Sequence, residues 1–253
     1  MKLSACIDIM MRDASLLQKL QTVREAGLTA FEFWGWENKE MPELTAAMEE
    51  TKLHAATFCT RMISLVDPEC RAEYVKGLEA TIPVAKALGC DRLITQTGAE
   101  RPGVSRLEQR QSLVQGLQAA VPLLEAQGIT LLVEPLNLLV DHAGYYLSQS
   151  GEAFAIIQEV NSPNVKVLYD IYHQQITEGN LIPTIETNVE SIGHFHVADH
   201  PGRHEPGTGE INYRNVLRAI EKSGYQGYVG LEFKPTTAAG EALQAVQRLV
   251  DQL

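Results

Sequence analysis

Four short apolar segments, each with one acidic or imidazole side chain near its end, constrain this chain more than any other feature. The segments are Leu131–Asn137, Val165–His173, Ile192–Asp199 and Tyr228–Lys234, and they carry Glu134, Asp170, His196 and Glu232. Branched apolar runs of this length are typical of strands buried in a parallel sheet. The four polar residues follow one another at intervals of 36, 26 and 36 positions. Each interval has room for a loop, a helix and a loop, so the spacing predicts consecutive βα units.

The same alternation is visible along the whole chain. Four further strands are expected at Leu3–Ile7, Ala30–Trp34, His54–Cys59 and Arg92–Gln96. Helices are expected at Ser15–Ala26, Pro42–Thr51, Pro68–Leu88, Ser105–Gln127, Ser150–Val160, Ile182–Val189, Tyr213–Ser223 and Gly240–Gln252. Several of these helices end directly before a glycine, which is a common helix terminator. Pro83 and Pro122 fall inside two of them, and Pro83 is expected to kink or interrupt its helix.

Eight strands alternating with eight helices indicate parallel strands joined by right-handed crossovers. The chain has 253 residues, and an α/β barrel of about 250 residues forms one domain. We therefore predict a single (βα)8 TIM-barrel domain over residues 1–253. An open doubly wound sheet is the alternative. It has less support, because no GxGxxG motif follows the first strand and no GxxxxGK[ST] motif occurs.

In a barrel, the carboxyl ends of all strands meet at one mouth, where catalytic residues lie. Glu134, Asp170, His196 and Glu232 should therefore come together. For one glutamate alone, a structural ion pair such as Glu232 with Lys234 is an equal alternative. Three clustered carboxylates, however, would repel one another without a cation. One nitrogen and three carboxylate ligands suit Mn²⁺, Mg²⁺ or Co²⁺, so one divalent metal ion is the expected cofactor.

The loops after these strands supply candidate substrate ligands. His173 follows Asp170 by three residues and is placed at the strand end. Residues 200–210 (HPGRHEPGTGE) are rich in glycine, proline and charge, and we interpret them as a substrate-facing lid that includes Arg203 and Glu205. Arg203 could bind a substrate carboxylate through two hydrogen bonds.

Two other groups of residues are weaker candidates. Asn137, Asp141 and His142 follow the fifth strand and could hydrogen-bond substrate hydroxyls. Trp34 and Trp36, after the second strand, either line the same pocket or simply pack in the core.

Composition excludes several classes of function. The formal net charge is −11, whereas nucleic-acid binding depends largely on lysine and arginine, so no nucleic acid is expected as a partner. No apolar run is long enough for a membrane span, and no signal peptide is recognisable. The four cysteines match no zinc-binding spacing, so reduced thiols in a cytoplasmic protein are expected. Barrels of this kind commonly associate, which leaves a homo-oligomer open.

The stretches EPLN, VLYDIYHQQ, HFHVADHPGRHEPGTGEINY and GLEFKPT resemble the hydroxypyruvate isomerase family of xylose-isomerase-like TIM barrels, which is related to the ketose 3-epimerases. The resemblance implies that Glu134, Asp170, His196 and Glu232 are metal ligands and that the two glutamates form an acid–base pair. It also places His173 and Arg203 at substrate-contacting positions. One departure is His196, because close hydroxypyruvate isomerases often have glutamine there and sugar epimerases have histidine.

The expected function is metal-dependent isomerisation of a small hydroxy-carbonyl compound, most simply hydroxypyruvate to tartronate semialdehyde. An enediolate would form by proton transfer between the two glutamates. The alternatives are a ketose 3-epimerase or a 2-oxo-tetronate isomerase, then an inosose-type dehydratase. A phosphodiesterase related to endonuclease IV, or a non-catalytic sugar-binding protein, is less well supported by the acidic surface and the four inward ligands.

Overall fold

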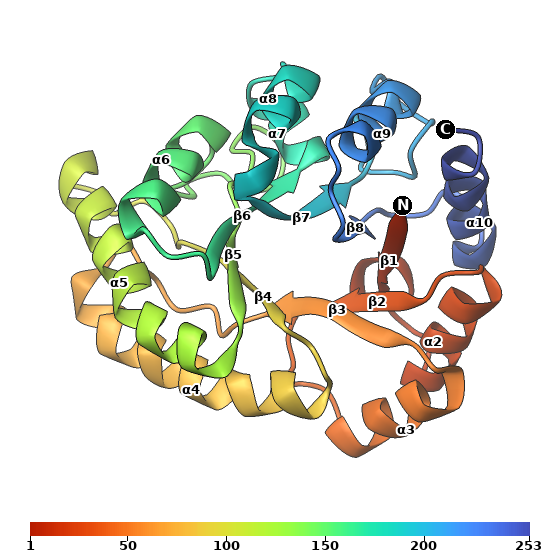
Figure 1. The fold of residues 1–253 in the computed structure, drawn as a ribbon, viewed down its shortest axis with the longest axis horizontal. Helices are drawn as coiled ribbons and strands as arrows, with labels where there is room; N and C mark the ends of the chain where they lie inside the picture. The colour runs from red at the N-terminus through yellow and green to blue at the C-terminus, as the bar shows by residue number, and fades with distance from the viewer.

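The computed structural model describes residues 1–253, whose eight strands form a closed parallel barrel (Figure 1). The strands are β1 (Lys2–Cys6), β2 (Ala30–Phe33), β3 (His54–Cys59), β4 (Arg92–Thr95), β5 (Thr130–Val133), β6 (Val165–Asp170), β7 (Ile192–Val197) and β8 (Tyr228–Leu231). Each strand pairs with the next in the chain, and β8 closes the barrel by pairing with β1. The predicted (βα)8 TIM barrel is confirmed.

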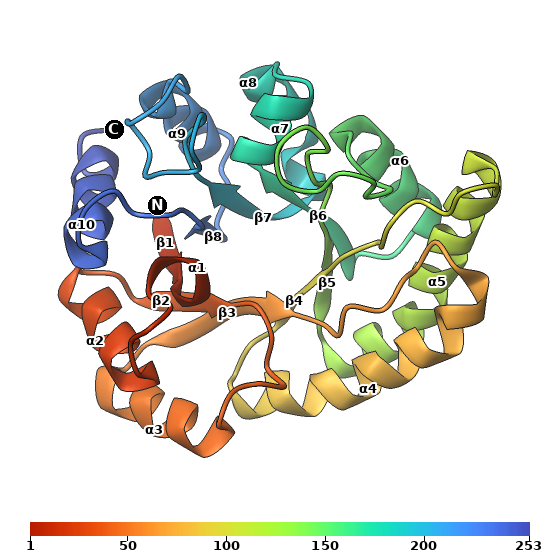
Figure 2. The ribbon, with the colours of Figure 1, turned by 180° about the vertical axis from the view of Figure 1, so that it is seen from behind.

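Helices form an outer ring around the strands in both views (Figures 1 and 2). The eight longer ones are α2 (Leu16–Glu25), α3 (Met41–Thr51), α4 (Arg71–Ala87), α5 (Arg106–Gln127), α6 (Ser150–Val160), α8 (Leu181–Asn188), α9 (Tyr213–Lys222) and α10 (Ala239–Val250). Shorter helical segments are α1 (Ile7–Met10), α7 (Ile171–Thr177) and the 3₁₀ turns η1 (Pro68–Cys70) and η2 (Val189–Ser191). Ser15 and Ser105 begin α2 and α5 with capping boxes. None of the helices combines the length and apolar character needed to cross a membrane.

Two expectations about the elements need correction. Helix α4 continues through Pro83, so the interruption considered there does not occur; flanking residues such as Ile82 and Ala85 are buried and hold the helix on the barrel. His173 lies in the first turn of α7, not at a strand end. The reason is Asp170, whose carboxylate accepts hydrogen bonds from the backbone N–H groups of Tyr172 and His173 and so starts a helix.

The interior of the molecule has two apolar parts. The large one is a cluster of 64 buried residues. A separate small cluster joins four adjacent strands through Cys59, Ile94, Leu132 and Leu168. Cys59 and Ile94 also line a cavity that contains Glu134 and Glu232. Packing within the barrel therefore supports the floor of the candidate site.

Candidate active site

The four residues expected to bind a metal lie together at the carboxyl ends of β5 to β8. One ligand atom from each of Glu134, Asp170, His196 and Glu232 lies within 4.8 Å of the others, and all four side chains are buried. His196 Nδ1 is 3.7 Å from Glu134 Oε1 and 3.5 Å from Glu232 Oε2. The strand spacing read from the sequence thus leads to a compact cluster of one imidazole and three carboxylates.

A cavity of about 210 Å³ opens onto this cluster. Its lining residues are Trp34, Cys59, Met62, Ile94, Gln96, Glu134, Leu136, His142, His173, His196, Arg203 and Glu232. The two glutamates therefore face a space that a small substrate can enter. The lining combines apolar walls with a few convergent polar groups, which is typical of a small-molecule site.

The cluster fits a divalent cation. His196 Nδ1 is buried and has no hydrogen-bond partner, although carboxylates lie on both sides of it. Burial raises the pKa of Glu134 and of Asp170. Burial would lower the pKa of His196, but Glu232 and the other nearby glutamates outweigh it and raise that pKa well above its usual value. The cluster thus needs positive charge, and its oxygen-rich donors suit a hard metal ion.

Glu232 differs from Glu134 in its hydrogen-bond donors. The indole Nε1 of Trp34 donates to Glu232 Oε1 at 2.7 Å, and the guanidinium of Arg203 donates to Oε2. Burial would raise the pKa of Glu232, but Arg203 and His196 outweigh it and lower that pKa. The side-chain oxygens of Glu134 have no comparable donors. The polar contact of Trp34 was missed in the sequence, where its position directly after a strand was the only signal.

Arg203 lies in the cavity wall, as expected for a substrate-contacting residue. Its backbone is in the left-handed region, with φ of 58°, and its guanidinium lies 5.1 Å from the centre of the Tyr172 ring. Besides Glu232, the guanidinium is 4.0 Å from Asp170 Oδ2 and 3.9 Å from Asp141 Oδ1. Arg203 thus places a buried positive charge beside the carboxylate cluster.

His173 also lines the cavity, whereas Asn137 and Asp141 do not. His173 Nδ1 accepts a hydrogen bond from Asn137 Nδ2 at 2.6 Å, and its Nε2 is 3.5 Å from Asp170 Oδ2. Asp141 accepts hydrogen bonds from Asn137 Nδ2 and from the Tyr172 hydroxyl, each at 2.9 Å. In this arrangement Asn137 and Asp141 hold His173 and Tyr172 in place, and they do not reach the cavity.

The loop of residues 200–210 is packed against the barrel. Asp199 accepts hydrogen bonds from the backbone N–H groups of His200, Gly207 and Ile211 at 2.8–3.1 Å. The carboxylate of Glu205 accepts from the backbone and hydroxyl of Thr236, and it does not line the cavity. Within this loop, Arg203 alone reaches the cavity, and Glu205 joins the loop to the segment after β8.

A buried glutamate below the cluster was not singled out in the sequence. Glu32 of β2 lies inside the barrel, with Oε1 2.9 Å from His194 Nε2 and Oε2 2.8 Å from His196 Nε2. The Ser4 hydroxyl also donates to Oε1. Burial would raise the pKa of Glu32, but His194 and His196 outweigh it and hold that pKa far below its usual value. In the segment AFEFW, Glu32 stands at the polar position of an alternating pattern that is typical of a half-exposed strand. The sequence therefore contains no sign that Glu32 is buried.

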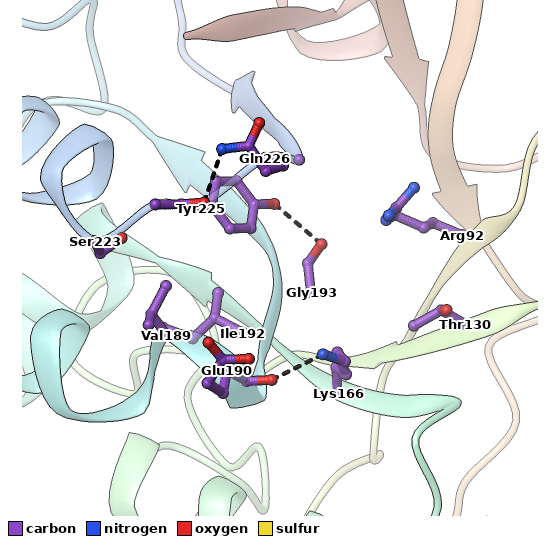
Figure 3. Close-up of a pocket in the computed structure, with 12 residues that line it drawn as sticks. Arg92, Thr130, Lys166, Val189, Glu190, Ile192, Gly193, Ser223, Tyr225 and Gln226 are labelled. Atoms are coloured by element: carbon purple, nitrogen blue, oxygen red, sulfur yellow. Dashed lines mark hydrogen bonds between the residues drawn. The ribbon is translucent and has the colours of Figure 1, made fainter.

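A second cavity of about 230 Å³ lies at the opposite end of the barrel. Arg92 and Ile192 begin β4 and β7 at its rim. Figure 3 shows that its polar groups bond to one another: Lys166 Nζ donates to the carbonyl of Glu190 at 2.8 Å, and the Tyr225 hydroxyl donates to the carbonyl of Gly193 at 3.0 Å. This cavity is separate from the carboxylate cluster and brings no acid–base pair together.

Comparison with known proteins decides the family. A family model described as Xylose isomerase-like TIM barrel matches residues 20–249. The chain belongs to this family. Within the xylose isomerase-like TIM barrels, it is 34% identical over 251 residues to hydroxypyruvate isomerase of Escherichia coli (strain K12), covering 95% of this chain and 96% of that protein. It is 30% identical over 249 residues to 2-oxo-tetronate isomerase of Cupriavidus necator, covering 94% and 95%. These relatives indicate that the chain is an isomerase of the xylose isomerase-like superfamily.

Solved structures share the whole fold of this chain. The structure named AP endonuclease, family 2, from Brucella melitensis is 27% identical, with a TM-score of 0.92 and 98% of both chains covered. The IOLI protein with a bound zinc atom is 18% identical, with a TM-score of 0.83 and coverage of 100% of this chain and 99% of that one. At 18% identity the likeness concerns the fold, so the case for a metal here depends on the cluster itself.

Proposed function

We propose that this protein is a metal-dependent isomerase that interconverts hydroxypyruvate and tartronate semialdehyde. The observation that carries the proposal is the placement of Glu134 and Glu232 on two sides of His196 Nδ1, both facing one small cavity. Two carboxylates around one centre can remove a proton from one carbon and return it to the next. The two isomerases among the relatives, which act on small hydroxy-carbonyl acids by their names, support the same chemistry.

Each step of the proposed reaction falls to a residue of this chain. Glu134 is the better initial base, because Trp34 and Arg203 already donate to both oxygens of Glu232. It removes a proton from the hydroxymethyl carbon, and the electron pair shifts toward the carbonyl to form an enediolate. A proton then returns to the former carbonyl carbon from Glu134, which carries the one it removed, or from Glu232 after it has accepted the substrate's hydroxyl proton. The other of these two protons goes to the former carbonyl oxygen, so that an aldehyde and a new hydroxyl result. The apolar wall from Cys59 and Ile94 limits water around the enediolate.

Glu134, Asp170, His196 and Glu232 would hold the metal ion, which we propose to be Mn²⁺, Mg²⁺ or Co²⁺. When bound, the ion supplies Lewis-acid stabilisation of the negative charge that develops on the substrate oxygens. Arg203 would bind the substrate carboxylate, since a guanidinium suits that group geometrically and its charge lies in the cavity wall. His173, held by Asn137, also lines the cavity and would contact a substrate oxygen.

A panel of substrates in D₂O tests this function. The purified protein, loaded with Mn²⁺, Mg²⁺ or Co²⁺, is incubated with hydroxypyruvate, a 2-oxo-tetronate and an unphosphorylated ketose, and products are followed by NMR. We expect tartronate semialdehyde from hydroxypyruvate and no turnover after the metal is removed by a chelator. The new hydrogen at the former carbonyl carbon is protium where Glu134 returns the proton directly and deuterium where the glutamate first exchanges with D₂O.

The same panel separates the alternatives. The two facing glutamates would also serve a ketose 3-epimerase, in which the proton returns to the carbon that it left. Preferred turnover of the ketose, with deuterium at the epimerised carbon, would contradict the proposal and establish that alternative. Preferred turnover of the 2-oxo-tetronate would keep the isomerisation and change the substrate.

A further inference from the structure

We propose that Glu32 is a positioning residue that fixes the tautomer of His196, so that the lone pair of His196 Nδ1 points at the carboxylate cluster. The inference rests on the proposed function insofar as it concerns a metal ion bound by that nitrogen. Glu32 does not line the cavity. It also makes no hydrogen bond to Glu134, Asp170 or Glu232. Its effect on the site would pass entirely through His196.

The tautomer follows from the two contacts of the imidazole. A neutral imidazole carries one N–H and one lone pair. His196 Nε2 is 2.8 Å from Glu32 Oε2, and an ionised carboxylate only accepts hydrogen bonds, so the hydrogen belongs on Nε2. The lone pair is then on Nδ1, the buried atom between Glu134 and Glu232 that has no hydrogen-bond partner. A carboxylate behind a histidine ligand fixes its orientation in the same way in many metal sites.

Two further residues hold the Glu32 carboxylate itself. His194 Nε2 lies 2.9 Å from Oε1, and the Ser4 hydroxyl donates to the same oxygen. With His196 on Oε2, both oxygens accept hydrogen bonds from side chains of the two strands β1 and β7. A buried carboxylate is costly unless donors surround it, and this set of donors leaves Glu32 little freedom to turn away from His196.

Glu32, His194 and His196 could in principle hold an ion of their own, because their ligand atoms also lie close together. That ion would need the lone pair of His196 Nε2, which places the hydrogen on Nδ1. Nδ1 would then have no lone pair to offer a metal ion in the carboxylate cluster. The two sites therefore exclude each other. Glu32 and His194 are 1% and 0% exposed and do not line the cavity at the cluster, whereas Glu134, His196 and Glu232 do. A metal ion can therefore reach the four-residue cluster more easily than Glu32, and Glu32 acts as a hydrogen-bond acceptor.

Gly230 provides independent support, because the barrel leaves space for this contact. Gly230 of β8 is in register with His196 of β7. A Cβ at this position would lie 2.7 Å from His196 Cδ2 and 2.8 Å from Glu32 Oε2, closer than real Cβ atoms approach their neighbours. The missing side chain at Gly230 is thus what allows the carboxylate and the imidazole to meet.

The first test measures the tautomer and the affinity for Mn²⁺ separately. Long-range ¹H–¹⁵N NMR of the wild-type protein reports which nitrogen of His196 is protonated. The protein is measured either loaded with the diamagnetic ion Mg²⁺ or free of metal at a pH where His196 is neutral. In both samples we expect the proton on Nε2. In Glu32→Gln, the amide accepts from one histidine only, so we expect a mixture of tautomers at His196. Titration calorimetry should then show Mn²⁺ affinity lower by about 10–100-fold, as for other residues behind metal ligands.

Controls separate positioning from a loss of structure. Glu152→Gln makes the same chemical change at a hydrogen-bonded glutamate that pairs with Arg106 on the outer helices, and it should keep wild-type Mn²⁺ affinity. Gly230→Ala should displace Glu32 from His196 and weaken Mn²⁺ binding while circular dichroism shows a folded barrel. If Glu32→Gln fails to fold, the wild-type tautomer and Gly230→Ala still decide the question.

The outcomes distinguish this inference from the proposed function. Protonated Nδ1 in the wild-type protein, or Glu32→Gln with unchanged tautomer and Mn²⁺ affinity, would overturn the role of Glu32. A wild-type protein that binds no divalent ion would overturn the proposed function, and the NMR comparison of wild type with Glu32→Gln would still establish or refute the positioning of His196.

Discussion

Glu134→Gln and Glu232→Gln should each lower kcat on hydroxypyruvate by about 10²–10⁴-fold, the usual contribution of a positioned acid or base. The amide keeps the shape of each side chain but cannot accept a proton from carbon. Glutamine can still coordinate a metal through its oxygen, so saturating Mn²⁺ should restore the part of the activity that is lost through weaker metal binding. The part that is lost with the acid–base function should remain. Steady-state kinetics at several Mn²⁺ concentrations measure both effects.

Folding has to be checked in both glutamine variants. Circular dichroism should match the wild type for both variants. Glu134→Gln should not lower the thermal midpoint much, since the three clustered carboxylates repel one another, whereas Glu232→Gln removes the charged partner of the buried Arg203 and should lower the midpoint more. Near wild-type turnover in either variant would refute the two-carboxylate scheme. If the loss were confined to Glu134→Gln, Glu232 would be left with the role of a metal ligand only.

Arg203→Gln should lower kcat/KM for hydroxypyruvate by roughly 10–100-fold, since hydrogen bonds to charged groups contribute about 1.5–3 kcal/mol. Most of this loss should appear in KM, and the inhibition constant of a dicarboxylate analogue such as tartronate should rise in parallel. Arg203→Lys keeps the charge without the planar pair of donors, so its loss should be intermediate.

Arg203 also donates to Glu232, and the split between KM and kcat separates its two roles. A fall in kcat with unchanged KM and unchanged tartronate inhibition would mean that Arg203 serves Glu232 and not the substrate. That result would remove the reason to expect a carboxylate on the substrate, and it would favour an uncharged ketose.

The barrel and the four clustered residues were predictable because their signals are local. Each βα unit repeats a short apolar run and a helix, several of the helices end at a glycine, and a carboxylate such as Glu134 stands out within an apolar run. Convergence then follows from topology alone, since parallel strands of a barrel place their carboxyl ends at one mouth. His173 was placed correctly near the site although its helix was missed, because Asp170 caps α7 within a stretch that still looks like a strand.

Glu32 and Trp34 escaped prediction because their meaning depends on distant partners. Glu32 meets His196 across 164 positions, and Trp34 meets Glu232 across 198. In a barrel, both faces of a strand are buried, so the alternation in AFEFW does not mark Glu32 as exposed. The cavity does not include Asn137, Asp141 or Glu205, and their hydrogen-bond partners could not be read from the sequence: Asp141 accepts from Asn137 and from Tyr172 of α7, and Glu205 accepts from Thr236.

The anchoring of the 200–210 loop by Asp199 has a consequence for the kinetics of encounter. Because Arg203 and Glu205 are buried and the loop turns on Asp199, the guanidinium is already in place before a substrate arrives. An anion must then reach one fixed positive charge on a protein of net charge −11. Added salt screens the long-range repulsion over about 10 Å at 0.1 M ionic strength. We therefore expect kcat/KM for hydroxypyruvate to rise from low to moderate ionic strength in stopped-flow or steady-state assays, and a steady fall would show that the local attraction of Arg203 outweighs the charge of the whole surface.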